Sequence, residues 1–191
     1  MNKVTKSKIL NLFIVFTMLF TSLAVPGNTV NAAKATYVVI SEVYGGGGNT
    51  GATLKSDFIE LFNPTENDIN LTGWRVQYAS KTGTFNNETA LSGVIKAGGY
   101  YLIKEASGTG GTEELITPDA VGSIAMSGSE CKVRLVYNNE NIIDFVGIGP
   151  SANESETSPT EKMTNSTSVQ RKDNDGNQAG QTNGWDTDNN S

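Results

Sequence analysis

The chain has 191 residues, with 14 basic and 20 acidic side chains, one cysteine and no histidine. That length suits one ordinary domain with its own hydrophobic core. The lack of histidine excludes Ser-His-Asp triads, Cys-His pairs and imidazole metal sites, and a lone cysteine excludes an internal disulfide. The chemistry that remains is that of carboxylates: two-acid hydrolysis or an all-oxygen metal site.

Residues 1–32 have the layout of a secretory signal peptide. Three lysines precede an apolar run from Ile9 to Val25, and small residues at Val30-Asn31-Ala32 offer a cleavage site. The alternative is an uncleaved membrane anchor, but polar residues interrupt the run and Pro26-Gly27 breaks it. We therefore expect a secreted, extracellular protein without a stable membrane span. After residue 32 the chain has 11 basic and 20 acidic residues, and its net charge of −9 disfavours nucleic-acid binding.

Short alternating runs separated by turn residues predict an all-β sandwich or barrel for the rest of the chain. The residues between 107 and 130 hold Gly and Ser turns and leave room for one weak strand or a helical turn. Cys131 begins an alternating run and is expected to be a buried apolar side chain. The last two predicted strands flank Asn138-Asn139-Glu140-Asn141 and predict a hairpin. The predicted strands are 37–43, 57–62, 74–78, 90–95, 100–104, 132–137 and 142–146.

Two connecting segments differ from the strands in composition. Residues 150–168 are almost wholly Ser, Thr, Asn, Glu and Pro, with Met163 the only large apolar residue, which predicts a mobile polar loop. The run Ser168-Val169-Gln170-Arg171 is then expected to re-enter the sheet. The Gly-rich stretch from Tyr44 to Lys55 lacks the Gly-Lys-Ser/Thr of a phosphate-binding loop and lies between strands, so it is interpreted as a flexible connection available to a partner.

Several of these segments, in order, resemble the lamin tail domain family. The resemblance covers roughly residues 36–191, nearly all of the chain after the predicted signal, and it implies an immunoglobulin-like β-sandwich. The matching runs are Val39-Ile40-Ser41-Glu42-Val43, Asp57-Phe58-Ile59-Glu60-Leu61-Phe62-Asn63, Leu71-Thr72-Gly73-Trp74, Tyr100-Tyr101-Leu102-Ile103, Asp144-Phe145-Val146-Gly147 and Ser168-Val169-Gln170-Arg171.

The resemblance also implies a module that accompanies other proteins. Similar bacterial domains are attached to extracellular nucleases, phosphatases or other surface proteins, and the related domain of nuclear lamins binds proteins and nucleic acid. We therefore expect a non-catalytic binding module that contacts a protein, a surface polymer or an enzyme substrate. One alternative is an accessory domain or fragment of an extracellular nuclease or phosphatase. Bacterial members commonly continue past a stretch like 186–190 into a further strand, which leaves open whether this domain has its last strand.

Glu42 and Glu60 are the acidic pair best placed to form a site. On regular strands Ile40 and Glu42 would share one face, as would Phe58 and Glu60, so pairing of the first two strands would bring the acids together. Facing like charges destabilise a sheet unless something neutralises them. This predicts a cation site or an acid pair with one raised pKa. The alternative, which we favour, has Glu60 bonded to loop amides or a base such as Arg75, with Glu42 in water.

Oxygen-rich turns near the C-terminus form a second candidate metal site. Asp173, Asp175, Asp186 and Asp188 lie among Asn and Gly residues, and calcium prefers such oxygen ligands. The EF-hand spacing fails when it is counted from Asp173. Because Asp, Asn and Gly are the usual turn residues, solvated turns are the favoured interpretation and no cofactor is expected. Calcium binding, with a role in adhesion, is the alternative.

Overall fold

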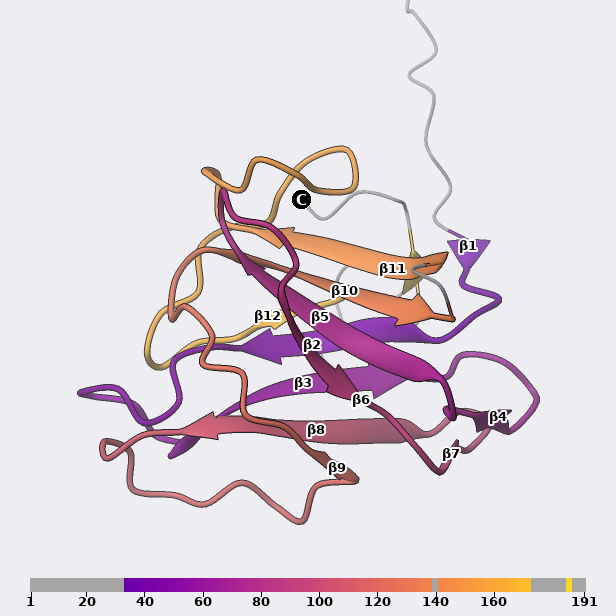
Figure 1. Ribbon diagram of the computed structural model, residues 1–191, viewed down its shortest axis with the longest axis horizontal. Coiled ribbons are helices and arrows are strands. Elements are labelled where there is room, and N and C mark those ends of the chain that lie inside the picture. Colours follow the sequence, from indigo (N-terminus) through magenta and orange to yellow (C-terminus); the bar gives the residue numbers. More distant parts are fainter. Residues whose placement is uncertain (1–32, 139–140, 173–184, 187–191) are drawn as a thin grey trace, which may run out of the picture.

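The structure is a computed structural model that describes residues 33–138, 141–172 and 185–186. The described residues form thirteen strands and no helix, and two sheets pack face to face, consistent with an immunoglobulin-like β-sandwich (Figure 1). The all-β prediction is therefore confirmed. Within these residues no helix has the length and apolarity to span a membrane. The predicted signal peptide, 1–32, lies outside the described part of the chain.

The first sheet has four antiparallel strands in the order β11-β10-β5-β6. Its centre is the predicted hairpin, which is confirmed, with a register shift between Leu135 and Val136 that the sequence pattern did not indicate. The strands are β5 (Trp74–Ser80), β6 (Asn87–Ala90), β10 (Cys131–Tyr137) and β11 (Asn141–Ile148).

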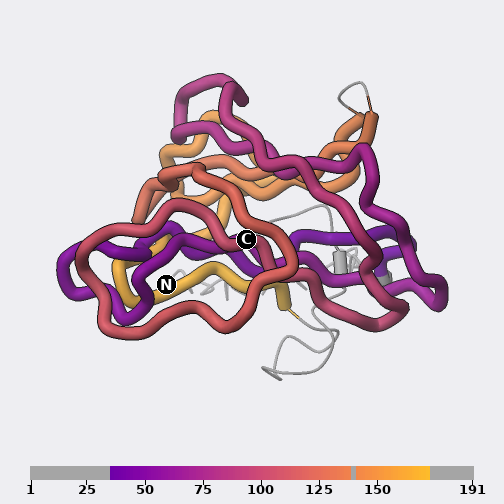
Figure 2. The backbone as a smooth tube through the Cα atoms, turned by 60° about the horizontal axis from the view of Figure 1, so that its bottom comes forward, coloured from indigo at the N-terminus to yellow at the C-terminus, as the bar shows by residue number. Residues whose placement is uncertain are grey.

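The second sheet has five strands in the order β12-β2-β3-β8-β9. Neighbours are antiparallel except β9, which runs parallel to β8. β9 is a short strand between 107 and 130, where the sequence left room for one weak strand or a helical turn. Figure 2 shows the yellow end of the described chain beside the indigo one, which confirms that the chain re-enters this sheet after the polar segment. The strands are β2 (Val39–Tyr44), β3 (Ser56–Phe62), β8 (Tyr100–Ser107), β9 (Ala120–Val121) and β12 (Val169–Gln170).

Two short strand pairings lie outside the two main sheets. β4 (Ile69–Asn70) pairs with β7 (Val94–Ile95), and β1 (Ala33–Lys34) pairs with β13 (Trp185–Asp186). The prediction of one strand over 90–95 is wrong because the chain turns at Gly93, whose φ of +80° suits glycine. The chain thus leaves the four-stranded sheet after β6 and pairs with β4 instead.

Alternate side chains of the two sheets meet in one apolar core. Each fully buried aliphatic side chain of this kind contributes roughly 1.5–3 kcal/mol. Cys131 is a free, fully buried thiol, as expected, and burial raises its pKa to about 12, so it stays protonated and unreactive. The central members of the core are Val76, Val133 and Leu135 from one sheet and Ile59, Leu61 and Ile103 from the other.

A buried ion pair joins the two sheets. Arg171, just after β12, donates from Nη2 to both carboxylate oxygens of Asp144 on β11, at 2.8 Å each. The Asp144 side chain is fully buried and also accepts the N–H groups of Ile40 (2.6 Å) and Phe145 (2.9 Å). Arg171 Nε donates to the carbonyl of Ile40 at 3.0 Å. The Asp-Phe-Val-Gly and Ser-Val-Gln-Arg runs of the sequence therefore meet at one point of the fold.

The polar segment 150–168, predicted to be a mobile loop, makes several contacts with the sandwich. Met163 is 1% exposed and belongs to the core, and its N–H donates to Ser129 O at 3.1 Å. Thr160 lies along the edge of β11, where its N–H donates to the carbonyl of Gly147 at 2.9 Å. Nearby, the buried ammonium of Lys132 donates to Asn153 Oδ1 at 2.8 Å. Mobility of the segment stays a prediction, but its path over the four-stranded sheet is defined.

Candidate functional site

A β-bulge sets which acidic side chains share a face. The register of β2 against β3 shifts between Ile40 and Glu42, so Ser41 is an extra residue in β2. A bulge places two residues opposite one on the partner strand and interrupts the alternation of faces. Ile40 consequently lies in the core, whereas Glu42 is directly opposite Glu60 on the outer face. The expectation that Ile40 and Glu42 share a face is therefore wrong, although the two acids do meet.

The two carboxylates of this acid pair have different surroundings. Glu60 Oε1 accepts a hydrogen bond from Ser41 Oγ at 2.8 Å. Burial raises the pKa of Glu60, and the charge of Glu42 raises it further, against the Ser41 hydrogen bond. Arg75 does not serve this pair, because it forms an ion pair with Glu88 (Nε to Oε2, 3.0 Å). The pairing thus leaves negative charge concentrated on the outer face of the five-stranded sheet.

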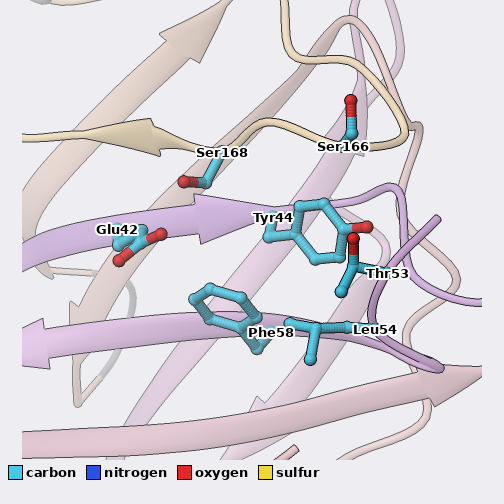
Figure 3. A pocket seen from close by; sticks show the side chains of 7 residues that line it. All are labelled: Glu42, Tyr44, Thr53, Leu54, Phe58, Ser166 and Ser168. Carbon is cyan, nitrogen blue, oxygen red and sulfur yellow. The ribbon is translucent and has the colours of Figure 1, made fainter. Parts of the chain in front are cut away.

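A pocket of about 250 Å³ opens beside Glu42 on that face. Figure 3 shows Glu42 at one end, Tyr44 and Phe58 along the middle, and Thr53 and Leu54 at the other end. Strands β2 and β3 supply its floor, the connection between them supplies one wall, and the polar segment supplies the rim. The lining residues are Glu42, Tyr44, Thr53, Leu54, Phe58, Ser166 and Ser168.

The aromatic floor of the pocket is held in place by hydrogen bonds. The rings of Tyr44 and Phe58 lie 5.6 Å apart between centroids, at an interplanar angle of 34°. Tyr44 Oη donates to the backbone carbonyl of Asn165 at 2.6 Å, which ties the rim to β2. The Asn165 amide in turn donates to Thr50 O at 3.0 Å. Burial raises the pKa of Tyr44, so its hydroxyl remains a neutral donor at ordinary pH.

The Gly-rich connection that forms one wall is closely packed. A Cβ on Gly45 would lie 2.3 Å from the carbonyl oxygen of Ser127, and one on Gly47 would lie 2.0 Å from the carbonyl carbon of Ser56. Gly48, whose φ is +68°, has equally little room, because a Cβ there would lie 2.2 Å from the backbone of Gly108. The glycines here allow backbone to lie directly on backbone, and the prediction of a merely flexible connection missed this packing.

Asp57 fixes the base of the connection from inside the sandwich. Its side chain is buried, and its two oxygens accept the N–H groups of Gly47 and Met126 at 2.8 Å each. Burial raises the pKa of Asp57 to about 6, the nearby charge of Glu105 adds to the rise, and the two hydrogen bonds oppose it. The sequence-based prediction gave Asp57 no role beyond that of the first residue of a strand. An acid next to an apolar alternating run was the available signal.

We predict that the protein becomes more stable as the pH falls from about 7 to about 5. Asp57 has a folded pKa of about 6 against an ordinary value of 3.8, so its contribution is full below 3.8 and is lost as the pH rises through 6. The full difference between the two pKa values corresponds to about 3 kcal/mol for this group, and only part of it is gained between pH 7 and pH 5. Partly buried Glu60 and buried Glu105 act in the same direction, because their pKa values are also raised.

Glu130 sets the lower limit of this pH effect. Its hydrogen bond with Lys81 lowers its pKa to about 2, so stability from Glu130 is lost below about pH 4.5. The melting temperature, measured by circular dichroism across this range, should rise towards pH 5 and fall in stronger acid. Asp57→Asn should flatten the rise. A melting temperature that drops steadily from pH 7 to pH 5 would contradict the prediction.

The remaining metal candidates are not brought together in the described part of the chain. Among those residues no three acidic or cysteine side chains form a group able to hold a metal ion. Asp173, Asp175 and Asp188 lie outside the described residues. Asp186 belongs to β13, where its backbone is in register with Ala33. Calcium binding at the C-terminal turns therefore stays an untested alternative.

Comparison with known proteins gives one match. A family model described as Lamin Tail Domain matches residues 31–150. A comparison with curated proteins found no match. The matched span contains the acid pair and the strands that floor the pocket, whereas Ser166, Ser168 and the ion-paired Arg171 lie beyond it.

Proposed function

Because this chain belongs to the lamin tail domain family, we propose that it is a secreted, non-catalytic binding module that holds a protein partner against the outer face of its five-stranded sheet. The pocket beside Glu42 is the observation that carries the proposal. It joins exposed polar rim residues to an aromatic floor, and binding surfaces commonly combine an aromatic centre with a polar rim.

The carboxylates on this face support binding better than catalysis. Glu42 and Glu60 are neighbours on paired strands, and the hydrogen bond from Ser41 to Glu60 is the contact that distinguishes them. Asp57 has a pKa raised to about 6, but both of its oxygens are occupied by backbone N–H groups inside the sandwich. A general acid or base must reach the proton that it transfers, and Asp57 is 4% exposed.

The absence of catalysis is tested with purified protein on nucleic-acid, phosphate-ester and glycoside substrates. We expect no turnover above that of buffer. Hydrolysis that disappears in both Glu42→Gln and Glu60→Gln would overturn the non-catalytic assignment, because those substitutions remove the acids and keep the fold.

Secretion and partner contact need a second measurement. The sequence of residues 1–32 supports export, so protein from the culture medium of a bacterial host should begin at Ala33 by intact mass. A photo-reactive residue at Ser166, on the pocket rim, should then crosslink an extracellular protein that the same residue at Glu161 does not. Intracellular retention of the full chain, or identical crosslinks from both positions, would count against the proposal.

A further inference from the structure

We propose that the pocket beside Glu42 receives one lysine side chain of the protein partner, with its ammonium at Glu42 and its aliphatic stem along Tyr44 and Phe58. This inference rests on the proposed function and names the chemistry of the partner at the same site. Three features carry it: the size of the pocket, its charge and the order of its lining residues.

The volume of the pocket matches a side chain better than a whole small molecule. Sites for small-molecule ligands typically enclose roughly 300–1,000 Å³, whereas a dry cavity of roughly 150 Å³ already admits benzene. At about 250 Å³ the pocket lies between these sizes. A ligand larger than one side chain must therefore leave its bulk outside, on the sheet surface, as the rest of a polypeptide would.

The negative charge of Glu42 favours a cationic ligand in the pocket. Glu42 makes no hydrogen bond or ion pair with any described residue, and none of the seven lining residues is basic. Its neighbour Glu60 is also an acid, so an ammonium group at Glu42 would relieve the repulsion between the two. Lys104 on β8 is paired with Phe58 on β3, but it does not line the pocket. The net charge of −9 after residue 32 also favours approach of a basic partner.

The order of the lining residues matches the two parts of a lysine side chain. Leu54, Phe58 and the ring of Tyr44 border the length of the pocket, and Glu42 stands at its end (Figure 3). Lysine buries its methylene stem along apolar surface while its ammonium keeps polar partners, and aromatic faces attract such a cation. Ser168 lies beside Glu42 in the same view, so its hydroxyl can accept a second ammonium hydrogen.

Lysine fits this arrangement better than arginine. A guanidinium is planar and favours a carboxylate that it can engage through two parallel hydrogen bonds. At this site the carboxylate is accompanied by the hydroxyl of Ser168 at the same end of the pocket (Figure 3). Separate single acceptors suit the three donors of an ammonium group.

The experiment compares three capped amino acids on the exported, ¹⁵N-labelled protein by NMR. The probes are the N-acetyl N-methylamides of lysine, norleucine and arginine, where norleucine keeps an aliphatic stem without charge. We expect the lysine probe to bind with a Kd of about 1 mM or weaker, with shifts centred on Tyr44, Phe58 and Ser168. Glu42→Gln should weaken it about tenfold or more, as loss of a charge-assisted contact does.

The matched control is Glu161→Gln, which makes the same charge change at an exposed residue outside the pocket. It should bind the lysine probe like the unaltered protein. Equal binding of norleucine, unaffected by Glu42→Gln, would overturn the lysine assignment while leaving a binding module with an apolar pocket. Stronger binding of arginine would also overturn it. If no probe shifts any pocket resonance, the lysine assignment fails and the pocket is not the contact site. The non-catalytic role is tested separately, because only turnover in the hydrolysis assay would overturn it.

Discussion

Arg171→Ala is expected to lower the free energy of unfolding by about 3–5 kcal/mol, the usual cost of removing one partner from a buried ion pair. The substitution leaves the fully buried carboxylate of Asp144 without its cation. It also removes the hydrogen bond from Arg171 Nε to the carbonyl of Ile40, which links the segment after β12 to β2. Urea unfolding at neutral pH, followed by circular dichroism, measures the loss.

Two further variants separate this effect from general sensitivity to charge. Arg171→Lys keeps the charge but not the two-atom contact with Asp144, so an intermediate loss is expected. Lys96→Ala removes an ion pair with Asp68 in which both side chains are well exposed, and its cost should stay below about 1 kcal/mol. Equal losses for Lys96→Ala and Arg171→Ala would show that the buried pair does not fasten the sheets.

Gly47→Ala is expected to cost about 3 kcal/mol, the upper end of the usual range for overpacking. The new methyl group would lie 2.0 Å from the carbonyl carbon of Ser56 and 2.3 Å from the nitrogen of Asp57, both backbone atoms of β3. The connection must move to admit it, and that movement strains the hydrogen bond from Gly47 N–H to Asp57. The same urea measurement applies.

Gly51→Ala is the comparison within the same connection. A Cβ at Gly51 meets no atom within 4 Å, but its φ is +81°, so the cost is limited to the left-handed conformation, about 1–2 kcal/mol. Gly47→Ala should therefore be the more damaging of the two. The reverse order would mean that backbone conformation, and not close packing, makes this connection depend on glycine.

The strands were predictable because alternation of apolar and polar residues is a local property. The runs around Ile59, Trp74 and Val133 each became a strand of one of the main sheets. The bulge at Ser41 was not predictable, since an inserted residue leaves the composition of the run unchanged and only moves its faces. That single residue decides which way Glu42 points.

Contacts between distant segments were the part that the sequence did not reveal. Asp144 and Arg171 belong to different strands, and nothing local marks them as partners; their adjacency follows from the packing of β11 beside β2. Met163 did carry a signal, as the one large apolar residue in a polar segment, and it lies in the core. The pocket also escaped prediction, because its rim comes from residues more than a hundred positions after its floor.

The path of residues 150–160 along β11 has a consequence for self-association. β11 is the outermost strand of its sheet, and an exposed outer strand offers free N–H and C=O groups to any other chain. Gly147 and Gly149 on this border instead bond to Thr160, and Phe145 N–H donates to Glu156 at 3.2 Å. The segment therefore occupies backbone groups at this edge of the sheet and protects it against intermolecular strand pairing. A protease cut within it would uncover a template for aggregation while leaving the apolar core of the two sheets in place.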